Sequence, residues 1–242
     1  MKLTNTCYAI LGLGCYPPWM VNAGFIVGDE KTLIIDSGPT YYAAQTIRGY
    51  AQNVKPGNEI IVINTEKHLD HIGGNSLFSE EGIKIYGHEL INRKNEDLIS
   101  NMDYFNQCII DEKRKAANEE QIFYEYTRIV NPEFHIKDGE KINLGFDKQV
   151  TVIFTPGHTK ANISILEPDE KVLYCGDSIV SGYLPNLNDG AVEDWKEWIK
   201  SLELISELDV EFVVPGHGKV LFGSDIQKEI NRIKRILKDA IL

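Results

Sequence analysis

Short apolar runs alternate with apolar residues at helical spacing along this chain. Apolar positions that recur every three or four residues predict helices over 41–50, 191–208 and 226–241, and a short helix opening at 73–75. Runs rich in β-branched residues predict strands at 7–11, 23–28, 32–35, 60–63, 83–86, 150–154, 163–166, 172–174 and 212–214. The pattern therefore predicts two similar halves, each built of strands followed by helices.

The middle of the chain has a different texture. Apolar residues at helical spacing predict two helices between about 95 and 130, ending near Pro132. The residues that carry this spacing are Leu98, Met102, Phe105 and Ile109, followed by Ile122, Phe123, Tyr126 and Ile129. They interrupt a β-rich pattern that resumes at about 141. Such an insert covers a cavity mouth or forms an oligomer contact, and the sequence leaves both open.

Polar segments follow several of the predicted strands and contain the candidate chemistry. Four of the six histidines fall in three of them: Thr65-Glu66-Lys67-His68-Leu69-Asp70-His71, Pro156-Gly157-His158 and Pro215-Gly216-His217-Gly218. A fourth segment is Gly176-Asp177. Imidazoles and carboxylates are the ligands that borderline and hard divalent metals take. The segments together supply seven candidate ligands, enough for two metal ions: Glu66, His68, Asp70, His71, His158, Asp177 and His217.

The order of these segments resembles that of the metallo-β-lactamase superfamily. The matching features are Leu33-Ile34-Ile35-Asp36-Ser37-Gly38, the Thr65–His71 segment, Thr155-Pro156-Gly157-His158-Thr159, Gly176-Asp177 and Pro215-Gly216-His217-Gly218. One such motif alone is a weak signal, whereas five in order are specific. The resemblance implies an α+β fold, an αββα sandwich of two mixed sheets, as one domain over 1–242 with the insert at about 95–130.

The resemblance also implies a ligand set. One metal pocket would receive Glu66, His68 and His158. The other would receive Asp70, His71 and His217, and Asp177 would bridge both ions. Asp36 resembles the family's outer acid, which hydrogen-bonds a ligating imidazole and fixes its tautomer.

Glu66 is where the chain departs from the family. The family pattern is H-x-H-x-D-H, whereas this sequence has E-x-H-x-D-H. Glu66 is expected to bind the metal directly. The alternatives are contact through water, or an ion pair with Lys67 or Lys160. Two divalent ions are expected. Zinc is the first expectation, and a carboxylate in place of imidazole makes manganese or iron alternatives.

Hydrolysis is the expected activity. A bridging hydroxide would attack a small ester, thioester or lactone while Asp70 orients it. Three carboxylates and the hydroxide would neutralise two divalent ions, so bound water should ionise at higher pH than in a site with three imidazoles. One alternative is a non-heme iron oxygenase using Glu66, His68 and His158, a 2-His-1-carboxylate set. Another is a metal-binding protein without turnover.

The composition and charge of the chain argue against some classes of binding partner. The chain has 242 residues and a formal net charge of −11, which argues against nucleic acid and anionic membranes. No apolar run suggests a membrane span or signal peptide, and the four cysteines form no C-x-x-C pair, so a cytoplasmic protein is expected. A small-molecule substrate is expected, and a homo-oligomer is compatible with the insert.

Several other residues have ordinary interpretations. His88 and His135 are expected to lie outside the site, and Trp195 with Trp198 is expected in the core. Asn162 is interpreted either as a substrate contact or as a structural hydrogen-bonding residue. The basic group Arg232, Lys234, Arg235 and Lys238 is expected to form a solvated helix face.

Overall fold

Two mixed β-sheets pack face to face at the centre of the structure. This computed structural model describes residues 1–14, 20–100, 124 and 126–242. The first sheet has the strand order β1-β2-β3-β4-β5-β6. Its strands are β1 (Cys7–Leu13), β2 (Val21–Val27), β3 (Lys31–Ile35), β4 (Glu59–Ile63), β5 (Ile85–Gly87) and β6 (Phe134–His135). β2 pairs antiparallel with both β1 and β3, and the pairs from β3 through β6 are parallel.

The second sheet is built from the second half of the chain. Its order is β12-β11-β10-β9-β8-β7, with β10 and β11 parallel and the other pairs antiparallel. The strands are β7 (Lys141–Gly145), β8 (Lys148–Phe154), β9 (Ile163–Glu167), β10 (Val172–Tyr174), β11 (Phe212–Val214) and β12 (Leu221–Phe222).

Apolar side chains from both sheets fill the space between them. Leu33, Ile35 and Ile63 of the first sheet share this core with Val152 and Ile165 of the second, and all five are at most 2% exposed. Successive residues on a strand point to opposite faces of the sheet. The uninterrupted β-branched runs of β3 and β4 therefore bury side chains on both faces of the first sheet. The inner face forms this core, and the outer face is covered by helices.

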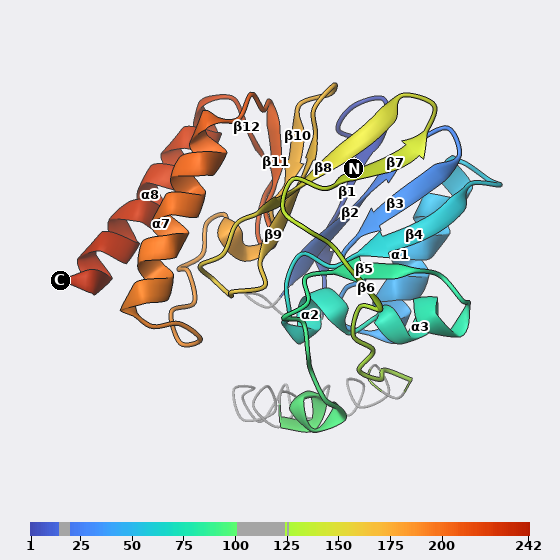
Figure 1. Cartoon of the computed structure of the whole chain (residues 1–242), viewed down its shortest axis with the longest axis horizontal. Helices are drawn as coiled ribbons and strands as arrows, with labels where there is room; N and C mark the ends of the chain where they lie inside the picture. The colour runs from blue at the N-terminus through green and yellow to red at the C-terminus, as the bar shows by residue number, and fades with distance from the viewer. Residues whose placement is uncertain (15–19, 101–123, 125) are drawn as a thin grey trace, which may run out of the picture.

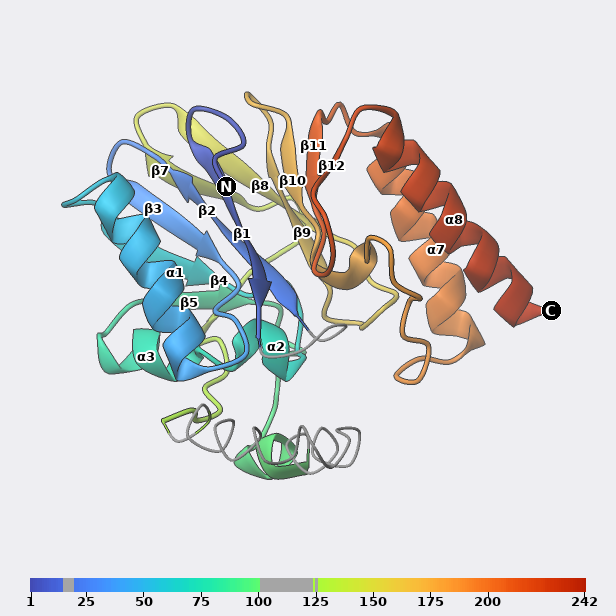
Figure 2. The ribbon, with the colours of Figure 1, turned by 180° about the vertical axis from the view of Figure 1, so that it is seen from behind.

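Two pairs of helices cover the outer faces. The helices α1 (Tyr41–Val54) and α3 (Asn75–Glu80) lie on the first sheet, and α7 (Val192–Glu207) and α8 (Ser224–Ile241) lie on the second. Figures 1 and 2 show these four layers from opposite sides. In α1, Ala44, Ile47 and Ala51 form the buried stripe, and the Thr40 hydroxyl accepts a hydrogen bond from the Ala43 amide (3.2 Å). The αββα sandwich expected from the sequence is confirmed.

Most predicted elements are present, and the differences are local. The two-residue strands β6 and β12 were not predicted, because two residues give no periodic signal. The short helix α2 (Leu69–Ile72), within the histidine-rich segment, was also not predicted. No helix among the described residues combines the length and apolar character that crossing a membrane requires.

The ends of the predicted insert pack beneath α2. Residues 95–100 are helical, whereas 127–132 are not, so the second predicted helix does not continue to 130; the remainder of both helices lies outside the described residues. Leu98 is 8% exposed and belongs to an apolar cluster with Leu69, Ile72 and Ala161. The short helix at 95–100 lies below α2 in both views (Figures 1 and 2). The base of the insert therefore supports the helix that bears the candidate ligands.

Replacing Leu98 tests this support. Leu98→Ala should lower the free energy of unfolding by on the order of 2 kcal/mol, because it removes buried methyl groups from a small cluster. Its neighbour Ile99 is 61% exposed, so Ile99→Ala is the matched control and should change stability by less than about 0.5 kcal/mol. Chemical denaturation measures both. Equal effects would show that the base of the insert is not packed on α2.

Candidate metal centre

The C-terminal ends of four strands deliver polar side chains to one edge of the two sheets. Glu66 follows β4, His158 follows β8, Asp177 lies in the 3-10 turn η1 (Gly176–Ser178) after β10, and His217 follows β11. This edge lies at the lower middle of Figure 1, beside α2. Because each strand is fixed by its neighbours in a sheet, these side chains stand on a rigid frame.

The helix α2 explains the spacing within the histidine-rich segment. His68 precedes the helix with an extended backbone (φ −69°, ψ 153°), and its carbonyl accepts a hydrogen bond from the His71 amide (3.0 Å). Asp70 and His71 lie in the turn itself. The change from extended to helical backbone therefore sends His68 toward one group of side chains, and Asp70 and His71 toward another.

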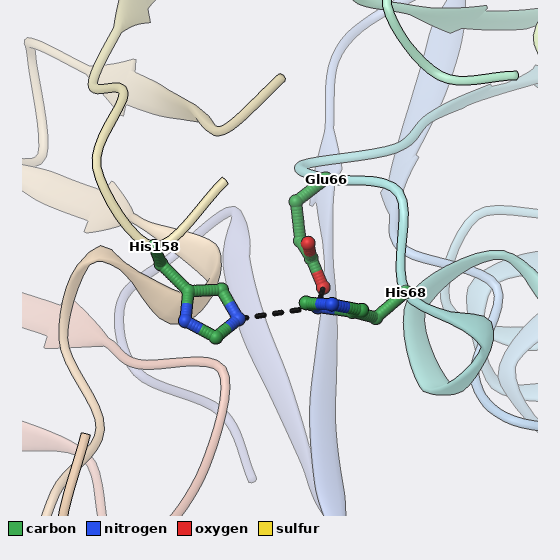
Figure 3. Close-up of side chains that lie close together, drawn as sticks. All are labelled: Glu66, His68 and His158. Atoms are coloured by element: carbon green, nitrogen blue, oxygen red, sulfur yellow. Dashed lines mark hydrogen bonds and ion pairs between the residues drawn. The ribbon is translucent and has the colours of Figure 1, made fainter. Parts of the chain in front are cut away.

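The first group consists of Glu66, His68 and His158 (Figure 3). Glu66 Oε1 lies 2.8 Å from His68 Nδ1, and His158 Nε2 lies 3.1 Å from the same nitrogen. One ligand atom from each residue falls within 4.8 Å of the others. Glu66 is fully buried, and its charged neighbours are imidazoles rather than a lysine; Lys160 pairs with Asp194 instead (3.7 Å).

The second group consists of Asp70, His71 and His217. Asp70 Oδ2 lies 3.2 Å from His217 Nε2 and 3.9 Å from His71 Nε2. His71 is fully buried, while the Asp70 side chain is 26% exposed. Asp70 therefore stands on the side of the group that solvent can reach.

Asp177 lies between the two groups. Its Oδ2 is 3.3 Å from His158 Nε2 and 3.4 Å from His217 Nε2, and its Oδ1 is 3.4 Å from His71 Nε2. Glu66 also reaches toward the second group, since its Oε1 lies 3.5 Å from His71 Nε2. The structure thus brings all seven predicted ligand residues together at one edge, as two groups that share a carboxylate.

Buried atoms without partners show that this arrangement fits metal ions. His71 Nε2 and Asp177 Oδ1 are buried and make no hydrogen bond, although they face each other at 3.4 Å. Burying a polar atom without a partner is costly. Neutral imidazole nitrogens and carboxylate oxygens converging at such distances are the donor set of a divalent metal site.

Outer partners fix the orientation of three of the four rings. Asp36 Oδ2 lies 2.8 Å from His71 Nδ1, as expected from the sequence, and Asp36 also accepts bonds from the amide and hydroxyl of Thr65, both at 2.7 Å. The Met20 carbonyl accepts from His217 Nδ1 (2.9 Å). Asp189 contacts His68 Nε2. His158 Nδ1 is buried without a hydrogen-bond partner among the described residues.

The carboxylates of the site are held in their ionised form. Burial alone would disfavour their charge. The neighbouring imidazoles nevertheless hold the pKa of Asp70 below its usual range, that of Asp177 well below it, and that of Glu66 below it. All three are therefore ready to bind a cation at neutral pH.

The neighbouring carboxylates raise the pKa of imidazoles in both groups. Despite burial, Glu66 raises the pKa of His68 to about 10, and Asp177 raises the pKa of His217 to about 11. His158 differs, because burial lowers its pKa. A metal ion binds neutral imidazole, so it must displace the protons that these pairs hold.

Two glycines allow the ligand loops to approach closely. A Cβ on Gly216 would lie 1.9 Å from Asp177 Oδ1, and a Cβ on Gly157 would lie 2.2 Å from the Trp198 Cβ. Gly157 also has φ +148°, a backbone conformation that residues other than glycine rarely adopt. The Pro-Gly-His sequences therefore serve to bring His158 and His217 against their neighbours.

Other predicted residues take structural places. Trp198 is buried in the core, as expected, and Trp195 packs against it from a partly buried position. Asn162 is buried and donates hydrogen bonds to the Cys175 carbonyl (3.2 Å) and the Ser178 hydroxyl (2.9 Å), so it ties the loops of the site together. His135 is exposed on β6, and His88 packs on Phe154 with 4.6 Å between ring centroids.

Two residues that contribute to the site were not predicted from the sequence. Asp189 lies in an exposed loop, and nothing in its sequence context marked it except an Asp-Gly turn signal. Arg232 was expected on a solvated face; instead its guanidinium donates to the carbonyls of Val180 (3.0 Å) and Tyr183 (2.6 Å). Asp189 lies in the loop that follows Asp177, and Arg232 donates its hydrogen bonds to the same loop.

The buried cysteines are poor candidates for ligands. Burial raises the pKa of Cys7 to about 12, and it raises that of Cys175 further. A thiol must ionise to bind metal or attack a substrate. Cys7 lies near Glu167, but that carboxylate is paired with Lys148 (2.8 Å). This second cluster is therefore interpreted as structural.

Comparison with known proteins places the chain in a family. The model of the metallo-β-lactamase superfamily matches residues 16–217. The chain belongs to this superfamily. It is accordingly a metallo-hydrolase, and members of the superfamily bind divalent metals, usually zinc.

Relatives and solved structures agree with this assignment. The chain is 27% identical over 214 residues to acyl-coenzyme A thioesterase MBLAC2 of Bos taurus, covering 84% of this chain and 75% of that protein. It is 28% identical over 138 residues to a hydroxyacylglutathione hydrolase of Legionella pneumophila, covering 56% and 40% of the two chains. A metallo-β-lactamase family protein of Thermus thermophilus superposes with a TM-score of 0.72 at 18% identity, covering 98% and 81%.

Removing the charge of Asp36 tests the outer support of the second group. Asp36 has φ +63°, which asparagine tolerates, so Asp36→Asn should fold. It should weaken metal binding in the group containing His71 by about 10–100-fold, because His71 loses its charged partner. Asp29→Asn, in the exposed β2–β3 turn, is the control. Competition titration measures both, and equal affinities would contradict the role of Asp36.

Proposed function

We propose that this protein hydrolyses thioesters at a dinuclear metal centre, with small esters and lactones as related substrates. The single observation that carries the dinuclear part is the position of Asp177, within 3.4 Å of imidazoles from both groups. The thioester preference is supported by relatives named as an acyl-coenzyme A thioesterase and a hydroxyacylglutathione hydrolase. Both names describe removal of an acyl group from a thiol carrier.

The two groups divide the work of binding two ions. Glu66, His68 and His158 would hold the first, Asp70, His71 and His217 the second, and Asp177 would contact both. Divalent ions in such a site polarise a carbonyl and lower the pKa of water. Asp70 stays ionised and partly exposed, so it can accept a hydrogen bond from the attacking water and orient it toward the substrate carbonyl.

An oxygenase is the second candidate. Glu66, His68 and His158 form a 2-His-1-carboxylate group, the arrangement of many non-heme iron oxygenases. The complete second group and the shared Asp177 favour the hydrolase. Iron-dependent oxygen consumption without ester cleavage would reverse this choice.

A substrate panel tests the proposed function. Protein reconstituted separately with zinc, manganese and iron should cleave an acyl-coenzyme A or an S-acylglutathione with higher kcat/KM than an oxygen ester, a lactone or a phosphodiester. Chelation should abolish turnover, and metal should restore it. Turnover of the phosphodiester alone, or of none of these substrates with full metal occupancy, would contradict the proposal.

The metal content gives a separate prediction. Elemental analysis should find close to two divalent ions per chain after reconstitution. His217→Ala should empty the second group and His158→Ala the first, each leaving about one ion. His135→Ala removes an exposed histidine and should leave two. A stoichiometry of one in the unaltered protein would remove the dinuclear centre.

Glu66 gives the sharpest test of ligand identity. Glu66→His would raise the charge of the metal cluster by one, so it should strengthen zinc binding in the first group and move the rising limb of the pH–rate profile to lower pH. Glu66→Gln should weaken first-group binding, because a neutral amide is a poorer ligand than a carboxylate.

Metal titration of the three proteins measures these effects. Glu89→Gln, an exposed charge removal on the loop after β5, is the control and should match the unaltered protein. If all four proteins bind the ion of the first group with equal affinity, Glu66 is not a ligand.

A further inference from the structure

The loop between η1 and α7 places the carboxylate of Asp189 beside the first group, although the loop belongs to the second half of the chain. Asp189 Oδ2 contacts His68 Nε2, and the two residues are 121 positions apart in sequence. The loop has little regular structure, and the Asp189 side chain is 38% exposed. This contact is separate from the ligand set, since it involves the ring nitrogen that faces away from Glu66 and His158.

His68 presents its ring differently from the other histidines of the site. Its Nδ1 faces inward, 2.8 Å from Glu66 Oε1, and its Nε2 faces Asp189. His71 and His217 do the reverse, with Nε2 inward and Nδ1 on an outer acceptor. A neutral imidazole carries one N–H and one lone pair. His68 can therefore offer a lone pair to the first group only as the Nε2–H tautomer.

We propose that Asp189 is the positioning residue of the first metal pocket. It accepts the Nε2–H of His68, which selects the tautomer whose Nδ1 lone pair faces Glu66 and His158, and it fixes the plane of the ring. This inference rests on the proposed metal centre. It assigns Asp189 no contact with substrate.

The loop is anchored at both ends, which gives Asp189 a defined position. At its start, Arg232 donates to the carbonyls of Val180 and Tyr183, and the Gly182 amide donates to Glu229 (3.0 Å). At its end, the amide of Ala191, two residues after Asp189, donates to Asp194 Oδ2 (2.9 Å). The second helix layer therefore holds the acid against a histidine of the first half.

The outer supports of the two pockets are unequal. Asp36 is 2% exposed and is held by Thr65 through two hydrogen bonds, whereas Asp189 is accessible to solvent and lies on a loop. Asp189 contacts His68, which belongs to the first group, so loss of Asp189 should weaken metal binding in that group. Since the outer partner of a ligating histidine typically contributes 10–100-fold to metal affinity, the effect is measurable.

Zinc titration against a competing chelator tests the proposal. Asp189→Ala should weaken binding of one of the two zinc ions by about 10–100-fold and leave the other unchanged. Asp189→Asn should lose less, because its amide oxygen still accepts the Nε2–H. Glu193→Gln, an exposed charge removal at the start of α7, is the matched control and should bind both ions as the unaltered protein does.

Ring nitrogen NMR distinguishes positioning from a general structural effect. In the zinc-loaded protein, the Nε2–H of His68 should be protected from exchange with solvent, and its Nδ1 should show the signal of a metal-bound nitrogen. Asp189→Ala should lose that protection, and Asp189→Asn should retain it in part. If the unaltered protein binds two zinc ions and Asp189→Ala matches it in affinity and ring signals, this inference is wrong while the proposed function stands. If the unaltered protein binds neither zinc, manganese nor iron, both fail.

Discussion

The burial of several carboxylates at one edge of the sheets is the constraint on which the rest of the structure depends. Glu66, Asp36 and Asp177 are each at most 5% exposed, and their mutual repulsion in a poorly solvated place must be balanced by positive charge. Imidazolium partners can supply part of that charge, and divalent cations can supply more of it. The fold provides for both, because each carboxylate faces an imidazole nitrogen within 3.5 Å.

The sandwich meets this constraint by joining two halves. Asp36 and Glu66 follow the parallel strands β3 and β4 of the first sheet, and Asp177 and His217 follow the parallel strands β10 and β11 of the second. The apolar core between the sheets fixes the two edges relative to each other. Neither half holds a complete site, so metal binding and the packing of the sheets should stabilise one another.

The sequence predicted the parts of this arrangement that depend on periodicity and order. The β-branched run at 60–63 and the apolar stripe of α8 are visible as patterns, and the five motifs indicate the family. The helix α2 was missed because its four residues serve the site and show no amphipathic repeat. The place of Asp189 depends on long-range packing of a loop, and so does the role of Arg232. No local pattern encodes either contact.

Anomalous diffraction from metal-loaded crystals tests the central claim most directly. Data collected at the absorption edge of the bound metal should show two peaks about 3.5–4 Å apart, the separation of two-metal catalytic sites. Asp177 should lie between them, with Glu66, His68 and His158 around one peak and Asp70, His71 and His217 around the other. A single peak, or a second peak remote from Asp177, would contradict a shared dinuclear centre.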